Sequence, residues 1–187
     1  MNIAKRFDRT IQPYLLVLAL IFVASFLAGT FVPSHAARRM TEMFQAMAGD
    51  YRELSGGMLF FNILVQNVMV TIFVILSGVI VGIIPAFAVG SNGFGLGVLF
   101  RQATDVSGYS KAALKVLPYG VFEIPALLIA ASYGLWLGMT VVRRIRGKES
   151  ASLKLRLEHA FRRYFAVVFP LLVVAAAIET ALILGMQ

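Results

Sequence analysis

The chain has 187 residues, of which 59% are hydrophobic and only 14% are charged, and its formal net charge is +8. A soluble domain of this size exposes too much surface to bury so many apolar side chains, and a disordered chain contains far fewer of them. The absence of cysteine excludes disulfide bonds, cysteine-ligated zinc and thiol catalysis. We therefore expect one integral membrane domain over residues 1–187.

The first predicted elements are a membrane span and an amphipathic helix. Residues 13–32 contain no charged side chain and follow Lys5, Arg6 and Arg9. A run of ~20 apolar residues is long enough to cross a bilayer. Residues 34–54 then show apolar side chains at helical spacing between charged ones. This helix is expected either in the membrane interface or packed against the bundle.

A second span and a broken crossing are predicted in the long uncharged run that follows. No Asp, Glu, Lys or Arg occurs from Leu54 to Phe100. As one helix this run would be ~70 Å long, against ~30 Å of hydrocarbon. Pro85 and the Gly-Ser-Asn-Gly sequence at 90–93 are expected to end the second span, which gives residues 62–89. Residues 93–117 then resemble two short helices joined by a break.

The last predicted elements are a span over residues 120–142, a second amphipathic helix over 150–163 and a final span over 164–185. Eight of the 17 basic residues lie between Arg143 and Arg163. Because basic residues flank spans on the cytoplasmic side, segment 143–163 is predicted to be cytoplasmic, in a protein of the cell membrane. The charge pattern does not decide on which side of the membrane the N-terminus lies. An internal N-terminus requires segment 91–118 to cross the membrane, whereas an external one leaves four spans.

The predicted fold class is therefore all-α. It is a polytopic transmembrane bundle with four clear spans, a broken fifth crossing and two amphipathic helices. Small residues recur every four positions within the spans and predict close packing between helices. The functional alternative is that these small residues line a pore. The residues concerned are Gly78, Gly82, Ala130, Gly134 and Gly138.

Ionisable and polar residues inside the apolar segments are the candidate functional residues. Glu123 and Glu179 are isolated within spans, where a charged carboxylate costs ~2.5–3.5 kcal/mol at the helix centre. They are expected either to hold helices together, through hydrogen bonds or a pair with Arg101, or to bind a proton or cation. Arg101 and Asp105 are four residues apart and are expected to pair, and Asn67 supplies a further polar group.

Motifs of known chemistry are absent from the sequence. There is no Walker A sequence, no HExxH and no GxSxG, and the two histidines, His35 and His159, lie far apart and outside the spans. We therefore expect no enzyme activity, no metal site and no cofactor. The basic residues come without a nucleic-acid-binding motif, so no nucleic acid is expected as a partner.

One stretch of sequence resembles a known family. The block Leu-Pro-Tyr-Gly-Val-Phe-Glu-Ile-Pro at 117–125, the Ser-Asn-Gly at 91–93 with Gly97, and the Ile-Glu at 178–179 resemble the stage II sporulation protein M family over residues 62–187. Tyr119 stands where typical members have His. The matching motif residues are Asn92, Gly93, Gly97, Pro118, Gly120, Glu123 and Pro125. The resemblance implies an integral membrane protein, which in endospore formers gathers peptidoglycan-degrading partners at the septum.

Two functions follow as expectations. The first is a non-enzymatic scaffold or assembly factor in the membrane, whose partners are the lipid bilayer and other membrane proteins or further copies of the chain. The alternative is a small transporter or channel component. In that case a polar cavity forms at segment 91–118, and Glu123 is the ion or proton site.

Overall fold

The computed structural model describes residues 9–48, 54–80, 82–148 and 152–185. These residues form helices and no strand, which confirms the predicted all-α class. Five helical segments are long and apolar enough to cross a membrane. They are α1 (Gln12–Thr30), α3 (Gly56–Ser77), α4 (Ile83–Ser107), the Gly120–Ile145 part of α5 (Tyr109–Ile145), and the continuous rod Leu153–Gly185.

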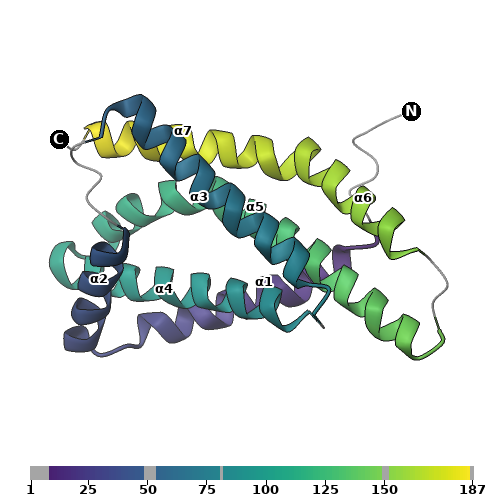
Figure 1. Ribbon diagram of the computed structural model, residues 1–187. Helices are drawn as coiled ribbons and strands as arrows, with labels where there is room; N and C mark the ends of the chain where they lie inside the picture. Colours follow the sequence, from purple (N-terminus) through teal and green to yellow (C-terminus); the bar gives the residue numbers. More distant parts are fainter. Residues whose placement is uncertain (1–8, 49–53, 81, 149–151, 186–187) are drawn as a thin grey trace.

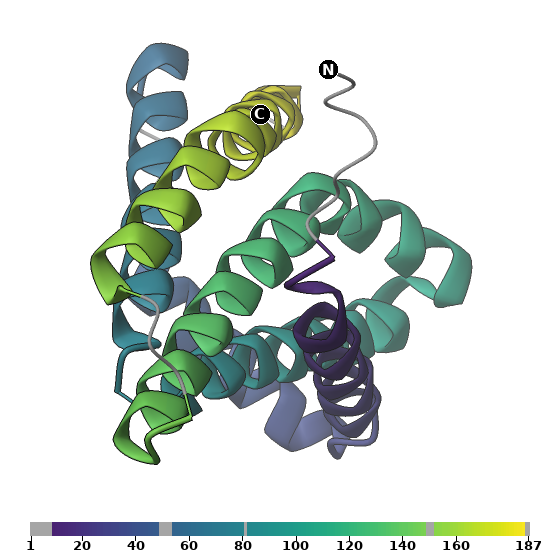
Figure 2. The same ribbon diagram turned by 90° about the vertical axis from the view of Figure 1, so that its right-hand side faces the viewer.

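Successive spans run in opposite directions, so the chain reverses at two ends of the bundle (Figure 1). One end carries the short helix α2 (Ser34–Ala48) and the junction between α4 and α5; we call it the α2 end. The other carries the start of α1, the C-terminus of α5 and helix α6 (Leu153–Arg163), and we call it the α6 end. Figure 2 views the molecule from the α6 end.

The final rod contains three helical pieces without a break. Helix α6 continues into a π-helical turn, η3 (Tyr164–Val168), and then into α7 (Phe169–Gly185). The wide turn lies just before Pro170, which has no N–H to donate and whose ring crowds the preceding turn of an ordinary α-helix. The extra residue in the turn lets the rod stay continuous past the proline. The second predicted amphipathic helix and the final predicted span are thus one rod.

The predicted break in the long uncharged run is in the wrong place. Helix α3 ends at Ser77, and Gly82 takes a left-handed conformation, with φ of 73°, before α4 begins. Glycine adopts this conformation without steric cost. Pro85 lies in the first turn of α4. Backbone N–H groups in the first turn have no acceptor within the helix, so the missing N–H of proline costs no hydrogen bond there. The predicted span 62–89 therefore belongs to two different helices.

The broken crossing predicted over residues 93–117 is corrected by the same geometry. Helix α4 is continuous from Ile83 to Ser107, through the glycines at 90, 93, 95 and 97. The chain turns only at Gly108, where φ is 79°, and α5 begins at the next residue. Pro118 and Pro125 both lie inside α5. An unbroken helix keeps its backbone groups paired inside lipid, which a glycine-induced break would not.

Glycines bring two pairs of helices into backbone contact. Between α3 and α5, a Cβ atom on Gly78 would collide with the backbone of Gly134, and one on Gly138 with the Gly78 carbonyl. Between α1 and α4, a Cβ on Gly93 would lie 2.6 Å from the carbonyl oxygen of Phe22. Ala130 is fully buried in the same core as Leu137 and Trp136. Contacts this close replace the hydrophobic drive that lipid cannot supply between helices.

We predict that Gly134→Ala destabilises the protein by about 1–3 kcal/mol, because its methyl group would lie 2.6 Å from the Val74 carbonyl oxygen and 2.9 Å from Pro85 Cγ. The matched control is Gly57→Ala in the first turn of α3, where no atom lies within 4 Å of the added Cβ. Thermal unfolding in detergent, followed by the fluorescence of the single tryptophan, Trp136, measures both. Equal midpoints for the two variants would contradict the close contact.

Candidate functional site

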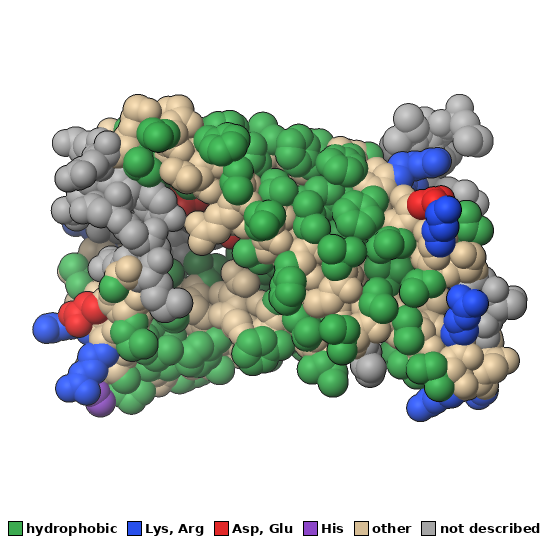
Figure 3. Space-filling view, viewed as in Figure 1, with side chains coloured by type: hydrophobic (Ala, Val, Ile, Leu, Met, Phe, Trp, Pro, Cys, Tyr) green, Lys and Arg blue, Asp and Glu red, His purple; other side chains and the backbone are tan. Residues whose placement is uncertain are grey.

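The candidate site is a partly open cavity of about 810 Å³ in the α2 half of the bundle. Helices α2, α4, α5 and α7 supply its walls, and Phe22 of α1 closes one side. Acidic atoms are visible inside a hollow near this end of the molecule (Figure 3). The polar residues that line the cavity are Thr41, Ser91, Asn92, Gln102, Ser107, Glu123 and Glu179.

Two carboxyl groups from different helices face this cavity. Glu123 lies about one turn, and Glu179 nearly two turns, inside the α2 end of their spans. No donor to either carboxyl group is found among the described residues. When both are charged they repel each other, so a cation bound near both lowers the free energy. The cavity is thus chemically suited to a positively charged ligand.

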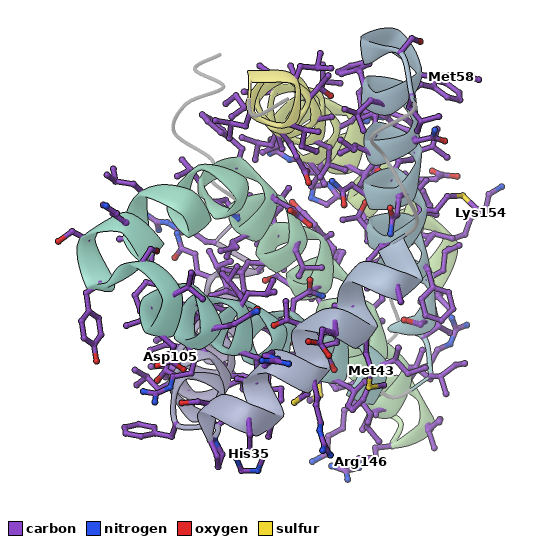
Figure 4. All side chains as sticks on the ribbon, turned by 90° about the vertical axis from the view of Figure 1, so that its left-hand side faces the viewer. His35, Met43, Met58, Asp105, Arg146 and Lys154 are labelled. Carbon is purple, nitrogen blue, oxygen red and sulfur yellow. The ribbon has the colours of Figure 1, made fainter. Side chains whose placement is uncertain are left out.

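A pair of Glu123 or Glu179 with Arg101, one of the alternatives that the sequence left open, is not formed among the described residues. Arg101 Nη2 lies 3.3 Å from Asp105 Oδ1, one turn further along α4, and also donates a hydrogen bond of 3.1 Å to Ser34 Oγ. The Arg101–Asp105 pair predicted from the spacing is therefore present. It sits at the α2 end, and neither residue is among those that line the cavity. Figure 4 views this end, with His35 and Met43 on α2 and Asp105 on the neighbouring α4.

Asn67 lies away from the cavity. It belongs to α3, and its backbone carbonyl accepts a hydrogen bond of 2.7 Å from Thr71 Oγ1. Thr71 also lies 3.1 Å from the hydroxyl group of Tyr164, which ties α3 to the π-helical turn. Of the five polar candidates, Glu123 and Glu179 therefore share the cavity, and Arg101 and Asp105 pair outside it. Asn67 lies on α3, one turn from the Thr71 contact with the final rod.

The cavity does not continue through the α6 half of the bundle. That half is filled by large side chains that are nearly or fully buried: Tyr133, Trp136, Leu137, Tyr164, Val168 and Leu172. Arg156 of α6 lies 5.0 Å from the centre of the Trp136 ring and donates a hydrogen bond of 2.6 Å to Thr140 Oγ1. Among the described residues, the cavity is therefore confined to the α2 half of the bundle.

Sequence reasoning missed Gln102 and Thr41 as lining residues. On α4 the lining positions 91, 92, 95, 99, 102 and 106 recur at helical spacing. This stripe is visible in the sequence only if residues 83–107 are taken as one helix. The prediction of a break near 90–93 hid the pattern. Thr41 gives no such signal, because which face of α2 contacts α4 depends on tertiary packing.

The family model for Stage II sporulation protein M matches residues 18–182, which is most of the chain. The chain belongs to the stage II sporulation protein M family. No match is found among the curated proteins or among the solved structures.

The part of the chain that matches the sporulation protein M family includes the whole cavity wall. Of the motif residues, Asn92, Gly120 and Glu123 line the cavity. Gly93 and Gly97 lie where α4 meets the backbone of α1. The motif thus serves two roles in this structure: it places polar groups in the cavity, and it brings α4 close to α1.

We predict that aqueous reagents enter the cavity and that cationic ones are favoured. In this cysteine-free chain, Gln102→Cys should react faster with a small cationic methanethiosulfonate than with an anionic one of similar size, because Glu123 and Glu179 share its cavity. Ser34→Cys, exposed near Arg38 and outside the cavity, is the control and should not favour the cation. Ala131→Cys, fully buried in the core, should react with neither. The same charge preference at positions 34 and 102 would argue against an acidic cavity.

Proposed function

We propose that this family member is a small membrane transport component that binds a cation or proton at Glu123 and Glu179. The observation that carries the proposal is the convergence of the two carboxyl groups on one cavity at membrane depth, without a donor among the described residues. Ionisable groups within spans are costly and typically line substrate or ion pathways. The proposal does not involve enzymatic chemistry.

The shape of the cavity favours a carrier over an open pore. The cavity lies in the α2 half, whereas the α6 half is packed with aromatic and aliphatic side chains. A cation that reaches the carboxyl groups can therefore cross only if helices move in the packed half. Alternating access of this kind is the usual arrangement in transporters, whose sites lie inside the bundle.

We further propose that the α6 end is cytoplasmic. The exposed arginines at 143, 144 and 146 lie at this end, and basic residues beside spans are enriched on the cytoplasmic side. Five alternating spans then place the start of α1 inside the cell as well. The cavity would open to the outer face of the cell membrane, so its ligand would enter from outside.

The orientation is tested by cysteine labelling in intact cells. We predict that Ser34→Cys and Ser107→Cys, both at the α2 end, react with a membrane-impermeant maleimide added outside, because the proposed orientation puts the α2 end on the outer face. Ser152→Cys, exposed at the α6 end, should react only after the cells are permeabilised. Labelling of Ser152→Cys in intact cells would invert the proposed orientation.

The transport proposal is tested by flux in liposomes. We predict that the purified protein dissipates an imposed proton, sodium or potassium gradient faster than protein-free liposomes do. Glu123→Gln and Glu179→Gln should reduce the rate to that of protein-free liposomes, because the amide keeps the shape of the side chain but cannot become charged. A pH-sensitive dye inside the liposomes reports proton flux, and ion-sensitive dyes report the two metal cations.

The matched control for these variants is Glu42→Gln. Glu42 is also a helical glutamate, but its side chain is 59% exposed on α2 and pairs with Arg38 at 3.1 Å. This variant should keep the wild-type flux. Wild-type flux in Glu123→Gln and Glu179→Gln, or no flux by the wild-type protein in any of the three gradients, would refute transport through the cavity.

Family membership favours a second proposal, a scaffold that assembles partner proteins in the membrane. The glycine stripes do not serve partners in this structure, because they are used in contacts of α1 with α4 and of α3 with α5. The large apolar side chains exposed on α3, such as Phe61 and Phe73, are available to lipid or to a partner. The two proposals differ in a complementation test, in which a strain lacking the gene receives the Glu123→Gln or the Glu179→Gln variant. The variants should restore the wild-type phenotype if the protein is a scaffold, but not if it is a transporter.

A further inference from the structure

A second feature lies at the opposite end of the molecule from the cavity. Helix α5 ends, and helix α6 begins, in a surface of exposed basic side chains, which is visible at the right-hand end of Figure 3. We call it the basic surface. Among the described residues of this end, Glu158 is the one acidic side chain. The basic surface is formed by Arg143, Arg144, Arg146, Lys148, Lys154 and Arg162.

The charge of the basic surface is not neutralised within the described part of the chain. The two ion pairs found among the described residues, Arg38–Glu42 and Arg101–Asp105, both lie at the α2 end. Arg156, which belongs to the same helix as Lys154, is already engaged with Trp136 and Thr140. The six exposed side chains therefore present a net positive field to whatever lies next to this end.

Exposed apolar side chains lie among these basic ones. Ile145 is 81% exposed, Leu155 65% and Phe165 60%. A soluble polyanion would leave these side chains in water. A bilayer surface instead accepts both kinds of group, because basic side chains reach the phosphates while apolar ones enter the acyl boundary. The combination fits a lipid surface better than a soluble anion.

The basic surface is also held in a fixed shape. The hydrogen bond from Arg156 to Thr140 and the stacking of Arg156 on Trp136 tie α6 to α5 across the intervening loop. The His159 ring packs against the rings of Tyr133 and Trp136 at centroid distances of 6.2 and 5.9 Å. Because the two helices are already ordered, binding does not require them to become ordered first.

We propose that the basic surface binds the headgroups of anionic phospholipids in the leaflet that it faces. The phosphates lie against the C-terminus of α5 and the exposed face of α6. Ile145, Leu155 and Phe165 enter the neighbouring acyl region. The site is separate from the cavity and does not depend on the proposed transport function, because no residue of the basic surface lines the cavity.

The test compares the full-length protein in nanodiscs of phosphatidylcholine alone and in nanodiscs of an equal mixture with phosphatidylglycerol. Thermal unfolding is followed by Trp136 fluorescence. We expect phosphatidylglycerol to raise the unfolding midpoint of the wild-type protein. Arg143→Gln/Arg144→Gln should lose at least half of this increase, since both side chains are exposed and hold no described partner. Added salt should reduce the increase, because it screens exposed charges.

The control is Arg38→Gln/Arg39→Gln, an adjacent arginine pair that is also exposed but lies at the α2 end, where Arg38 pairs with Glu42. It should keep the full increase. The midpoint in phosphatidylcholine alone shows whether each variant still folds, and Lys154→Gln/Arg162→Gln tests the same surface from α6.

An equal increase in the wild type and in both variants of the basic surface would overturn the proposal. So would an equal rise produced by inorganic phosphate in phosphatidylcholine nanodiscs, which would assign the surface to free phosphate.

Discussion

Backbone contact between helices at glycine is the constraint on which the rest of the structure depends. Lipid tails are as apolar as leucine, so burial alone gives helices little reason to associate, and close packing has to hold them. Gly78, Gly134 and Gly138 bring α3 against α5, and Gly93 and Gly97 bring α4 against α1. Helices α4 and α5 are joined by the turn at Gly108, at the α2 end. The polar cavity lies in this half of the bundle, with both carboxyl groups in its wall.

The two halves of the bundle have different physical characters because of this packing. The α6 half contains the aromatic and aliphatic core, and Arg156 fastens α6 to it. The α2 half contains the cavity, the Arg101–Asp105 pair and α2, whose residue Ser34 accepts a hydrogen bond from Arg101. Regions with few buried apolar contacts open at lower free energy than a packed core. We therefore expect movement around the cavity to begin in the α2 half.

The sequence was sufficient to predict the membrane class, the all-α fold and the Arg101–Asp105 pair, because each depends on composition or on spacing within one helix. The break between the second and third spans was predicted wrongly. Glycine often ends helices in water, but a helix in lipid continues through Gly90 and Gly93, and the turn falls at Gly82, where the backbone is left-handed. The meeting of Glu123 with Glu179 could not be predicted at all, since it depends on how α7 is rotated against α5.

The distribution of charge along the membrane normal connects the cavity with the basic surface. Basic side chains gather at the α6 end, and the two buried carboxyl groups lie toward the opposite end. A cation entering from the α2 end is drawn to the carboxyl groups first and meets the positive field only beyond the packed half. Anionic lipid at the α6 end would neutralise part of that field. Lipid binding at one end would then alter the electrostatic barrier to a cation held at the other, without any contact between the two sites.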